Sequence, residues 1–365
     1  MSEKVRVGVI GTSWYADLFH LPSLKSHPRA ELAAICGRNS DRAKAMANKY
    51  EIPSVFSDYR AMIEKGNLQA VVVATPDDLH YPMTMEALDA GMHVVCEKPL
   101  SLNIGQAREM YKKAEAVGVK HMVPFSYRWI PLYRYLKNLV DENYIGRCFH
   151  CNIRYLGGHG RQNQYAWRFD RKRSNGVLGD LGSHMIDLAR WIFGDIAKVS
   201  CHLATFVDRE PPEGRTFDPA NDSAHLALEF ENGSQGMIHI SAVCHTGDRI
   251  QEQHVSFHGE AGTLEADYAM GKSAEIRGVR SEEEIFQTLL VPESYRGDVD
   301  QTKPLISQII EMCLKQSVGD RLFIDAILED RPVSPNFYDG LKAQEVIDSA
   351  IKSHNTERWT SIEKS

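Results

Sequence analysis

One lysine stands where an enzyme could use it. Lys98 follows the short run at 93–97, which predicts a buried strand, and it precedes Pro99. A residue before proline is disfavoured in helical geometry, so this side chain is aimed by a turn. Open α/β sheets bind ligands beyond the carboxyl ends of their strands. Lys98 is therefore a candidate catalytic residue, and a solvated lysine in a turn is the alternative.

A histidine between two aspartates forms the second candidate. Asp180, His184 and Asp187 recur at spacings of four and three residues within the segment 175–195. This spacing predicts one helix that carries the three polar side chains on the same face. A carboxylate one turn from a histidine can orient the imidazole and raise its basicity. Such an imidazole suits a base that takes a hydroxyl proton while a hydride leaves the same carbon. An exposed Asp/His pair is the alternative.

A turn that could hold phosphate follows the first predicted strand. The strand VRVGVI (5–10) runs into GTSWYA (11–16), and a helical pattern follows, as dinucleotide-binding folds require. Gly11 fills the tight-turn position and Ala16 the small helix-packing position, but Ser13 replaces the glycine that lets the backbone approach a pyrophosphate. Serine can still donate to phosphate, and an ordinary glycine turn is the alternative. We expect cofactor contacts from Gly11, Thr12, Ser13, Trp14 and Tyr15.

The end of the second predicted strand bears on the choice of cofactor. An acidic residue that would hold the ribose 2′-hydroxyl of NAD is missing there, and Gly37 takes its place. Arg38 follows, with Asn39 beside it, and a guanidinium suits a 2′-phosphate. The sequence therefore favours NADP, with NAD as the alternative. Arg38 could instead stack on the adenine or face solvent.

The elements that must position these residues follow two patterns. Over residues 1–126, short apolar runs alternate with helical patterns, which predicts an α/β Rossmann domain with a doubly wound parallel sheet. Over residues 127–365, helical stretches near 131–142 and 180–193 precede alternating segments such as 225–240, which predicts two strands around an Asn-Gly turn. We expect an α+β domain here, closed by a helix over 338–354.

Composition excludes several other function classes. The chain has 365 residues, 43% of them apolar and 25% charged, as in ordinary globular proteins. Its net charge of −7 has the wrong sign for a dedicated nucleic-acid binder. The seven cysteines are scattered, which favours a reducing compartment. No apolar run approaches the roughly 18 residues of a membrane span, and no leader pattern is visible, so we expect a cytoplasmic protein without membrane contact.

No metal site is expected. Cys148 and Cys151 form a lone CxxC motif without a second pair, in a segment whose alternation indicates a strand, so both are interpreted as structural thiols. His254 and His258 lie in another predicted strand, where four residues span about 13 Å, too far for both to bind one ion.

Together these motifs resemble the Gfo/Idh/MocA oxidoreductases, the family of glucose-fructose oxidoreductase and inositol 2-dehydrogenase. The resemblance spans nearly the whole chain. It rests on GTSWYA, ATPDDLH (74–80), EKP (97–99), PFSYRW (124–129), GVLGDLGSHMID (176–187) and NFYDGLKAQEVIDSA (336–350). It implies a Rossmann domain, a C-terminal domain built on a large mostly antiparallel sheet, and a homo-oligomer, dimer or tetramer, that associates through the open face of that sheet.

The resemblance also implies residue roles. Lys98, Asp180 and His184 match the family's active-site lysine, aspartate and histidine, with His184 as the acid/base and Lys98 bound to the reacting oxygen. The expected cofactor contacts along the sheet edge are Thr75, Pro76, His80, Glu97 and Lys98, besides Arg38 and Asn39. The loop 157–173 is expected to shape the substrate pocket. The expected substrate contacts are Lys98, Tyr127, Arg128, Arg161, Trp167, Arg168, Asp180 and His184, and a surface loop with cation–π pairs is the alternative for 157–173.

The activity implied by the resemblance is NAD(P)-dependent hydride transfer to or from a secondary alcohol or ketone of a sugar or cyclic polyol. Two alternatives stay open. One is a glycosidase-like enzyme that retains NAD and oxidises the sugar only transiently. The other is a non-catalytic NADP-binding regulatory protein that keeps the fold without turnover, against which the intact Lys98, Asp180 and His184 argue.

Overall fold

The computed structural model describes residues 4–212, 214, 216–270 and 272–363, which form two compact units. The first unit contains the residues up to Phe125 together with 298–300 and 308–341. The second contains 126–297, 301–307 and the described residues from Lys342 onward. The boundary expected at residue 126 did not anticipate the return of 308–341 to the first unit. That return rests on contacts between residues 300 positions apart, which no local pattern encodes.

A parallel sheet with the strand order β3-β2-β1-β4-β5-β6 forms the centre of the first unit. All its pairings are parallel. The four residues of β4 are Ala-Val-Val-Val and all are buried, as expected for a strand covered on both faces. The strands are β1 (Val5–Ile10), β2 (Ala30–Cys36), β3 (Ser54–Phe56), β4 (Ala70–Val73), β5 (His93–Cys96) and β6 (His121–Met122).

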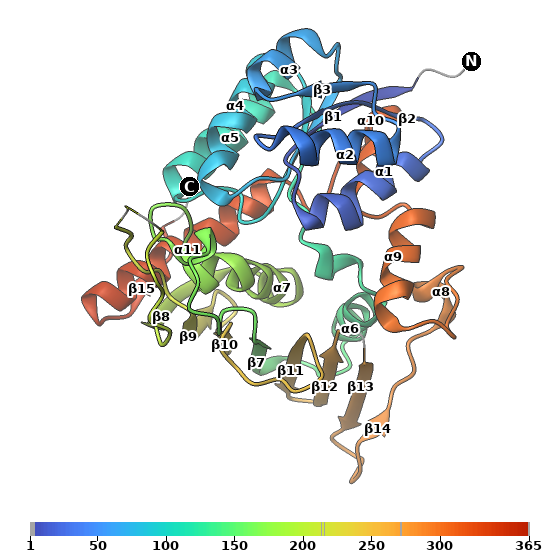
Figure 1. Ribbon diagram of the computed structural model, residues 1–365. Coiled ribbons are helices and arrows are strands. Elements are labelled where there is room, and N and C mark those ends of the chain that lie inside the picture. Colours follow the sequence, from blue (N-terminus) through green and yellow to red (C-terminus); the bar gives the residue numbers. More distant parts are fainter. Residues whose placement is uncertain (1–3, 213, 215, 271, 364–365) are drawn as a thin grey trace. The chain divides into compact units, whose positions relative to one another are not determined.

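Helices cover both faces of this sheet, α1 and α2 on one side and α3, α4 and α5 on the other (Figure 1). The later helix α10 packs against α1. Along the chain, each of these helices connects one strand of the sheet to the next, except α10, which belongs to the returning segment 308–341. Their bounds are α1 (Leu21–Ser26), α2 (Ser40–Tyr50), α3 (Tyr59–Lys65), α4 (His80–Asp89), α5 (Ile104–Val117) and α10 (Asp320–Leu328). The doubly wound parallel sheet expected from the sequence is therefore confirmed.

The second unit is built on a sheet with the order β14-β13-β12-β11-β7-β10-β9-β8-β15. Its pairings are antiparallel, except that β7 and β10 run parallel. β9 and β10 form the hairpin predicted around the Asn-Gly turn. The strands are β7 (Cys148–Gly157), β8 (Ile196–Ala204), β9 (Ser223–Phe230), β10 (Gln235–Ser241), β11 (Gln251–Gly259), β12 (Gly262–Ala269), β13 (Ser273–Arg280), β14 (Gln287–Thr288) and β15 (Thr360–Ser361).

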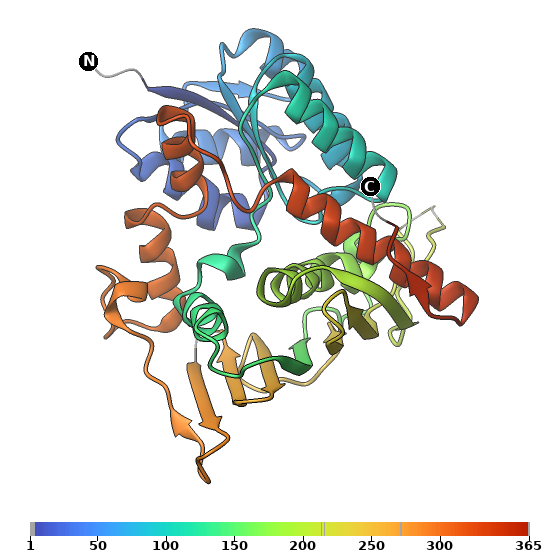
Figure 2. The same cartoon turned by 180° about the vertical axis from the view of Figure 1, so that it is seen from behind.

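Within this unit α6, α7 and the later turns of α11 lie on one face of the sheet (Figure 2). The far end of α11 contacts β8, where Ser353 Oγ accepts a hydrogen bond from the Cys201 amide at 3.0 Å. The stretch that follows β13 contains the short elements β14 and α8. The helices of this unit are α6 (Pro131–Asp141), α7 (Ser183–Phe193) and α8 (Glu293–Arg296), while α9 (Leu305–Lys315) and α11 (Phe337–Thr356) each contribute residues to both units.

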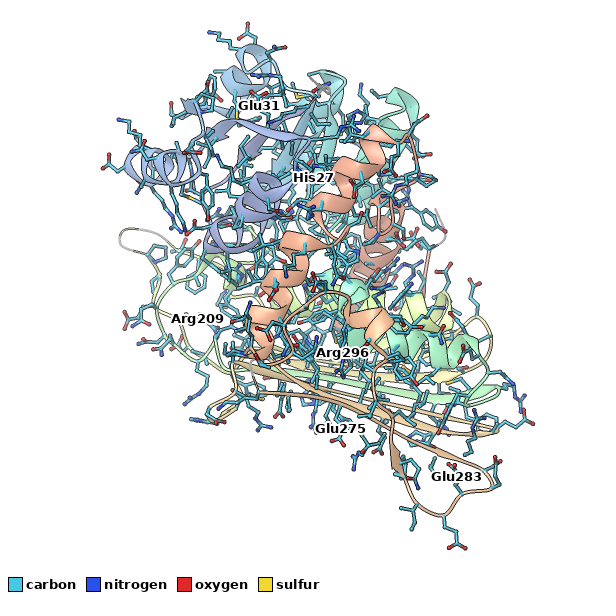
Figure 3. The ribbon with its side chains drawn as sticks, turned by 90° about the vertical axis from the view of Figure 1, so that its right-hand side faces the viewer. His27, Glu31, Arg209, Glu275, Glu283 and Arg296 are labelled. Atoms are coloured by element: carbon cyan, nitrogen blue, oxygen red, sulfur yellow. The ribbon has the colours of Figure 1, made fainter. Side chains whose placement is uncertain are left out.

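The opposite face of this sheet carries polar side chains. Figure 3 shows Glu275 on β13 pointing away from the side that bears the helices. Strand register places His202, His225, His239, Arg154 and His254 in one row across five neighbouring strands. The rings of His225 and His239 stack with their centroids 4.0 Å apart.

The structure also bears on the cysteines and on metal binding. Cys148 and Cys151 lie on β7 as free thiols, in the strand that was predicted for them. Within the described ranges, no group of three or more His, Cys, Asp or Glu side chains is arranged to hold a metal ion. Among the same residues, no helix is both long enough and apolar enough to cross a membrane.

Candidate active site

The turn after β1 has the geometry of a dinucleotide cradle. Gly11 adopts a φ of +119°, and a Cβ there would lie 2.2 Å from the carbonyl oxygen of Ala74, so only glycine fits. Ser13 Oγ accepts a hydrogen bond from the Ala16 amide at 3.1 Å, and Ala16 is fully buried. The hydroxyl proton of Ser13 therefore stays available to donate to an anion. Trp14 is 60% exposed at the mouth of this turn.

The order of the sheet places three predicted site segments at one edge. β1, β4 and β5 are neighbours and run parallel, so the turn that begins at Gly11, the segment at Thr75 and the turn at Glu97 follow adjacent strand ends. Thr75 Oγ1 is buried and has no hydrogen-bond partner among the described residues. A buried hydroxyl without a protein partner, next to a turn that can bind phosphate, is consistent with a polar ligand that binds at this edge of the sheet.

The end of β2 explains why no acidic residue stands there. A Cβ at Gly37 would lie 2.6 Å from Thr12 Cγ2, so a side chain at this position would collide with the phosphate turn. Arg38 and Asn39 follow and are exposed. Asn39 caps α2, because its side chain accepts from the Arg42 amide at 2.9 Å. Arg38 is thus an exposed cationic side chain that a ligand could contact at the end of β2.

Two buried contacts hold the turn around Lys98. The Lys98 amide donates to Glu97 Oε2 at 3.2 Å. On the other side, His80 Nδ1 lies 2.8 Å from the Pro99 carbonyl oxygen, and His80 Nε2 lies 3.0 Å from that of Thr75. Burial alone would lower the pKa of His80, but Cys96 and the two carbonyl groups outweigh it and raise the pKa to about 9. The imidazolium can donate to both carbonyls at once.

His80 therefore acts on the backbone of its neighbours. It is fully buried and joins the segment after β4 to the turn after β5. Its expected contact with the cofactor stays a prediction, and its observed contacts fix the positions of Thr75 and Pro99. The sequence motif ATPDDLH contained this histidine but did not indicate what its ring would bind.

In the second unit, Asp180 lies in a π-helical segment, Leu178–Gly182, that leads directly into α7. π-helical turns are rare and occur often at functional sites. The carboxylate of Asp180 is 15% exposed, 3.4 Å from Arg168 Nε and 3.6 Å from His159 Nε2. Asp180 thus lies beside two side chains of the loop 157–173, Arg168 and His159, and the sequence did not single out His159.

His184 opens the first turn of α7 and is buried. The ring of Tyr127 meets it edge-on, with centroids 4.8 Å apart and planes at 78°. The Tyr127 hydroxyl donates to the Tyr155 hydroxyl at 3.1 Å and accepts from Gln251 Nε2 at 3.0 Å. Burial raises the pKa of Tyr127 to about 12, so it is a neutral phenol at pH 7. These contacts hold the Tyr127 ring in place beside the His184 imidazole.

Asp187 is used differently from the other two polar residues of this segment. It accepts from Arg128 at 2.9 and 2.6 Å, and the two side chains are 2% and 8% exposed. This bidentate pair ties α7 to the segment 126–129. Asp180 lies in the π-helical segment, while His184 and Asp187 lie in α7, so the three residues do not belong to one regular α-helix as the spacing predicted. The predicted contact of Arg128 with substrate stays a prediction.

An arginine outside the predicted site organises the loop 157–173. Arg209 is buried, pairs with Asp222 at 3.1 Å and donates to the Gly160 carbonyl at 2.5 Å. Its guanidinium also stacks 3.7 Å from the centre of the Phe169 ring. Figure 3 labels this arginine. The loop is therefore anchored at both its start and its middle, which a sequence pattern could not indicate.

The predicted substrate residues of this loop lie near that anchor. Arg168 stacks on Trp167, with its guanidinium carbon 4.4 Å from the ring centre, while it also reaches Asp180. Arg161 is exposed. The second unit therefore brings together Asp180, Arg168 and Trp167, and independently places His184 beside Tyr127.

Comparison with known proteins extends over both units. Residues 5–125 match the description "Oxidoreductase family, NAD-binding Rossmann fold", and residues 137–362 match "Oxidoreductase family, C-terminal alpha/beta domain". The chain is 25% identical to an inositol 2-dehydrogenase of Rhizobium meliloti, over 98% of this chain and 99% of the relative. It is also 25% identical to a levoglucosan dehydrogenase of Pseudarthrobacter phenanthrenivorans, over 90% of this chain and 88% of the relative.

A solved structure shares the fold. A levoglucosan dehydrogenase in complex with NADH and levoglucosan superimposes with a TM-score of 0.87 at 24% identity, covering 99% of this chain and 100% of the other. The family matches span most of the chain, and the motifs at the strand ends and at α7 fall within them. The chain therefore belongs to the Gfo/Idh/MocA family and is an NAD(P)-dependent oxidoreductase.

Proposed function

We propose that this protein is a dehydrogenase that reversibly oxidises a secondary alcohol of a sugar or cyclic polyol and prefers NADP to NAD. The observation that carries the proposal is the Lys98 turn, held by Glu97 and His80 at the sheet edge that also bears the Gly11 turn. The names of the relatives support the substrate class, since they include an inositol and a levoglucosan dehydrogenase.

The first unit supplies the cofactor contacts in this proposal. The turn from Gly11 to Tyr15 receives the pyrophosphate on its backbone amides and on Ser13 Oγ. Thr75 Oγ1 is buried and has no hydrogen-bond partner among the described residues. In this proposal it forms a hydrogen bond with the nicotinamide end of the cofactor, beside Pro76. Arg38 carries the preference for NADP, because a guanidinium binds a phosphate dianion with charge-assisted hydrogen bonds. A bound nicotinamide supplies the hydride acceptor or donor.

Proton transfer falls to the residues of α7 and to the lysine. His184 takes the hydroxyl proton as the alcohol is oxidised and returns it in reduction. Lys98 donates a hydrogen bond to the reacting oxygen and stabilises the negative charge that develops there. Asp180, which lies beside Arg168 and His159, orients the substrate and the side chains around it.

The loop 157–173 supplies the sugar contacts in this proposal. Trp167 offers an aromatic face for the carbon side of a ring, and Arg161 and Arg168 offer donors for hydroxyl groups. Because Arg209 and Asp222 pin the loop from inside, these contacts are held ready before substrate arrives.

The test is a panel of sugars, inositols and their keto forms, assayed by nicotinamide absorbance at about 340 nm with each cofactor. We expect turnover with at least one member and a higher kcat/KM with NADP. Lys98→Met and His184→Ala should abolish turnover while cofactor binding persists. Near-normal activity in both variants would reject the assignment. Tightly retained cofactor without net absorbance change would favour a glycosidase-like enzyme, and binding without any reduction would favour a regulatory protein.

We also propose that the protein forms a homo-oligomer through the polar face of the second unit's sheet. This face bears the row of histidines described above and the side chain of Met237, which is 58% exposed. Light scattering should give a mass of two or four chains, and Met237→Glu should lower it. A monomeric wild-type protein would contradict this proposal.

A further inference from the structure

A buried histidine of the first unit lies between two carboxylates. His20 ends the π-helical segment Ala16–His20 and is 3% exposed. Its Nε2 lies 3.1 Å from Glu97 Oε1, and its Nδ1 lies 3.0 Å from Asp320 Oδ2. The carboxylates are buried as well, with side chains 13% and 6% exposed. His20 thus links the turn after β5 to α10, which reaches the sheet from the far end of the chain.

The charges of this group are set by one another. Burial alone would lower the pKa of His20, but the charges and hydrogen bonds of Asp320 and Glu97 outweigh it and raise the pKa to about 10. Burial would likewise raise the pKa of Glu97, but His20, Lys98 and His80 together lower it. At neutral pH the group is therefore carboxylate, imidazolium, carboxylate. An imidazolium donates from both ring nitrogens, so each carboxylate receives one hydrogen bond.

The second oxygen of Glu97 is the one that touches the proposed catalytic turn. Glu97 Oε1 contacts His20 while Oε2 accepts from the Lys98 amide, so the carboxylate is held at both ends. A rotation of the Glu97 side chain would break both contacts at once. The position of Lys98 therefore depends on a chain of hydrogen bonds that begins at the first residue of α10.

We propose that His20 and Asp320 are positioning residues for Lys98, acting through Glu97, and that the returning segment 308–341 is in this way a working part of the active site. The inference rests on the proposed role of Lys98. Its chemistry is a relay of charge-assisted hydrogen bonds without any proton transfer in the reaction. Other charged or titratable groups that face it are His80 and Lys98, beside Glu97, Cys313, beside Asp320, and Tyr15, whose ring meets that of His20 edge-on with centroids 5.5 Å apart.

A second His–Asp pair provides a matched control, because His20 and His27 flank the two ends of α1 and both bind a carboxylate of α10. His27, just after α1, has its Nε2 3.0 Å from Asp325 Oδ1 on α10, and among the hydrogen bonds and ion pairs of the described residues none joins His27 to Glu97. Figure 3 shows His27 next to the returning segment. Asp320→Asn and Asp325→Asn both remove a carboxylate that holds α10 on α1. Only the first should disturb the Lys98 turn.

The experiment measures kcat, KM and cofactor affinity against pH for the wild type, Asp320→Asn, Asp325→Asn and Lys98→Met. We expect Asp320→Asn to lower kcat about 10- to 100-fold, as for a slightly misplaced catalytic group, with cofactor affinity unchanged within about twofold. The alkaline limb of its kcat profile should also move to lower pH, because His20 loses the charge that keeps it protonated. Asp325→Asn should leave kcat and the profile as in the wild type.

Three outcomes separate the claims. Wild-type kinetics in Asp320→Asn beside an inactive Lys98→Met would overturn the inference and keep the proposed function. An active Lys98→Met would instead reject the proposed function. Equal losses in Asp320→Asn and Asp325→Asn, without a shift of the profile, would show that α10 matters only for docking. Nitrogen NMR of labelled histidine in the wild-type protein gives a readout free of turnover, and a His20 ring that is neutral at pH 8 would also overturn the inference.

Discussion

The buried pair between Arg128 and Asp187 makes a prediction that can be worked out from the structure. In Asp187→Asn the side chain keeps its shape and loses its charge, while the guanidinium stays 8% exposed against the same helix. Removing one member of a buried ion pair typically costs about 3–5 kcal/mol, because the remaining charge has no compensation. The carboxamide can still accept one hydrogen bond, so we expect a loss in the free energy of unfolding of about 3 kcal/mol.

Two further variants calibrate this value. Glu229→Gln removes a carboxylate of the same unit that pairs with Lys198 at 3.1 Å, where both side chains are nearly half exposed. That change should cost less than about 1 kcal/mol. Arg128→Met combined with Asp187→Leu removes both charges and should recover most of the stability lost in the single variant.

Urea unfolding followed by circular dichroism measures all four proteins. A loss of about 3 kcal/mol corresponds to a fall in Tm of about 6–12 °C for a unit of this size. His184 opens the helix that Asp187 holds, so Asp187→Asn should also lower kcat. Two results would refute the reasoning: a loss below about 1 kcal/mol in Asp187→Asn, or a double variant no more stable than Asp187→Asn. Either result would mean that the loss of the Asp187 charge does not leave the Arg128 guanidinium destabilising.

Three other predictions concern the first unit. Gly11→Ala should prevent dinucleotide binding in a fluorescence titration, because the new Cβ would meet the Ala74 carbonyl oxygen at 2.2 Å; normal affinity would contradict the cradle. Arg38→Ala should weaken NADPH binding about 10- to 100-fold and leave NADH unchanged, and equal effects on both would argue against a 2′-phosphate contact. The free energy of unfolding should fall as pH rises from 6.5 to about 10, since the pKa of His20 is raised on folding to about 10 from an ordinary value of 6.5. A flat profile in urea series over that interval would contradict the buried imidazolium.

In the first unit, the strands and two of the site residues could be predicted from the sequence. Strands buried on both faces read as continuous apolar runs, so the runs at 5–10 and 93–97 predict β1 and β5 closely. Gly11 and Lys98 could be placed at strand ends for the same reason. The role of His80 could not be predicted, because its partners are backbone carbonyls whose positions are set by the turn it stabilises.

Long-range contacts account for most of what the sequence did not reveal. His20 is flanked by Phe19 and Leu21 and forms no motif with its sequence neighbours, and its partner Asp320 is 300 positions away. Arg209 and Asp222 lie in a stretch without regular structure, yet they anchor the loop 157–173. The regular helix expected over 180–193 begins instead with a π-helical segment, which changes the direction of Asp180 and which no residue pattern signals.

The most direct test of the central claim follows the hydride itself. A substrate from the active part of the panel is labelled with deuterium at the secondary carbon, and the nicotinamide product is examined by mass spectrometry and NMR in the wild type and in Lys98→Met. The account predicts that the wild type moves deuterium to C4 of the nicotinamide and that the variant, with cofactor bound, moves none. Oxidation without deuterium at C4, or undiminished transfer by the variant, would contradict it.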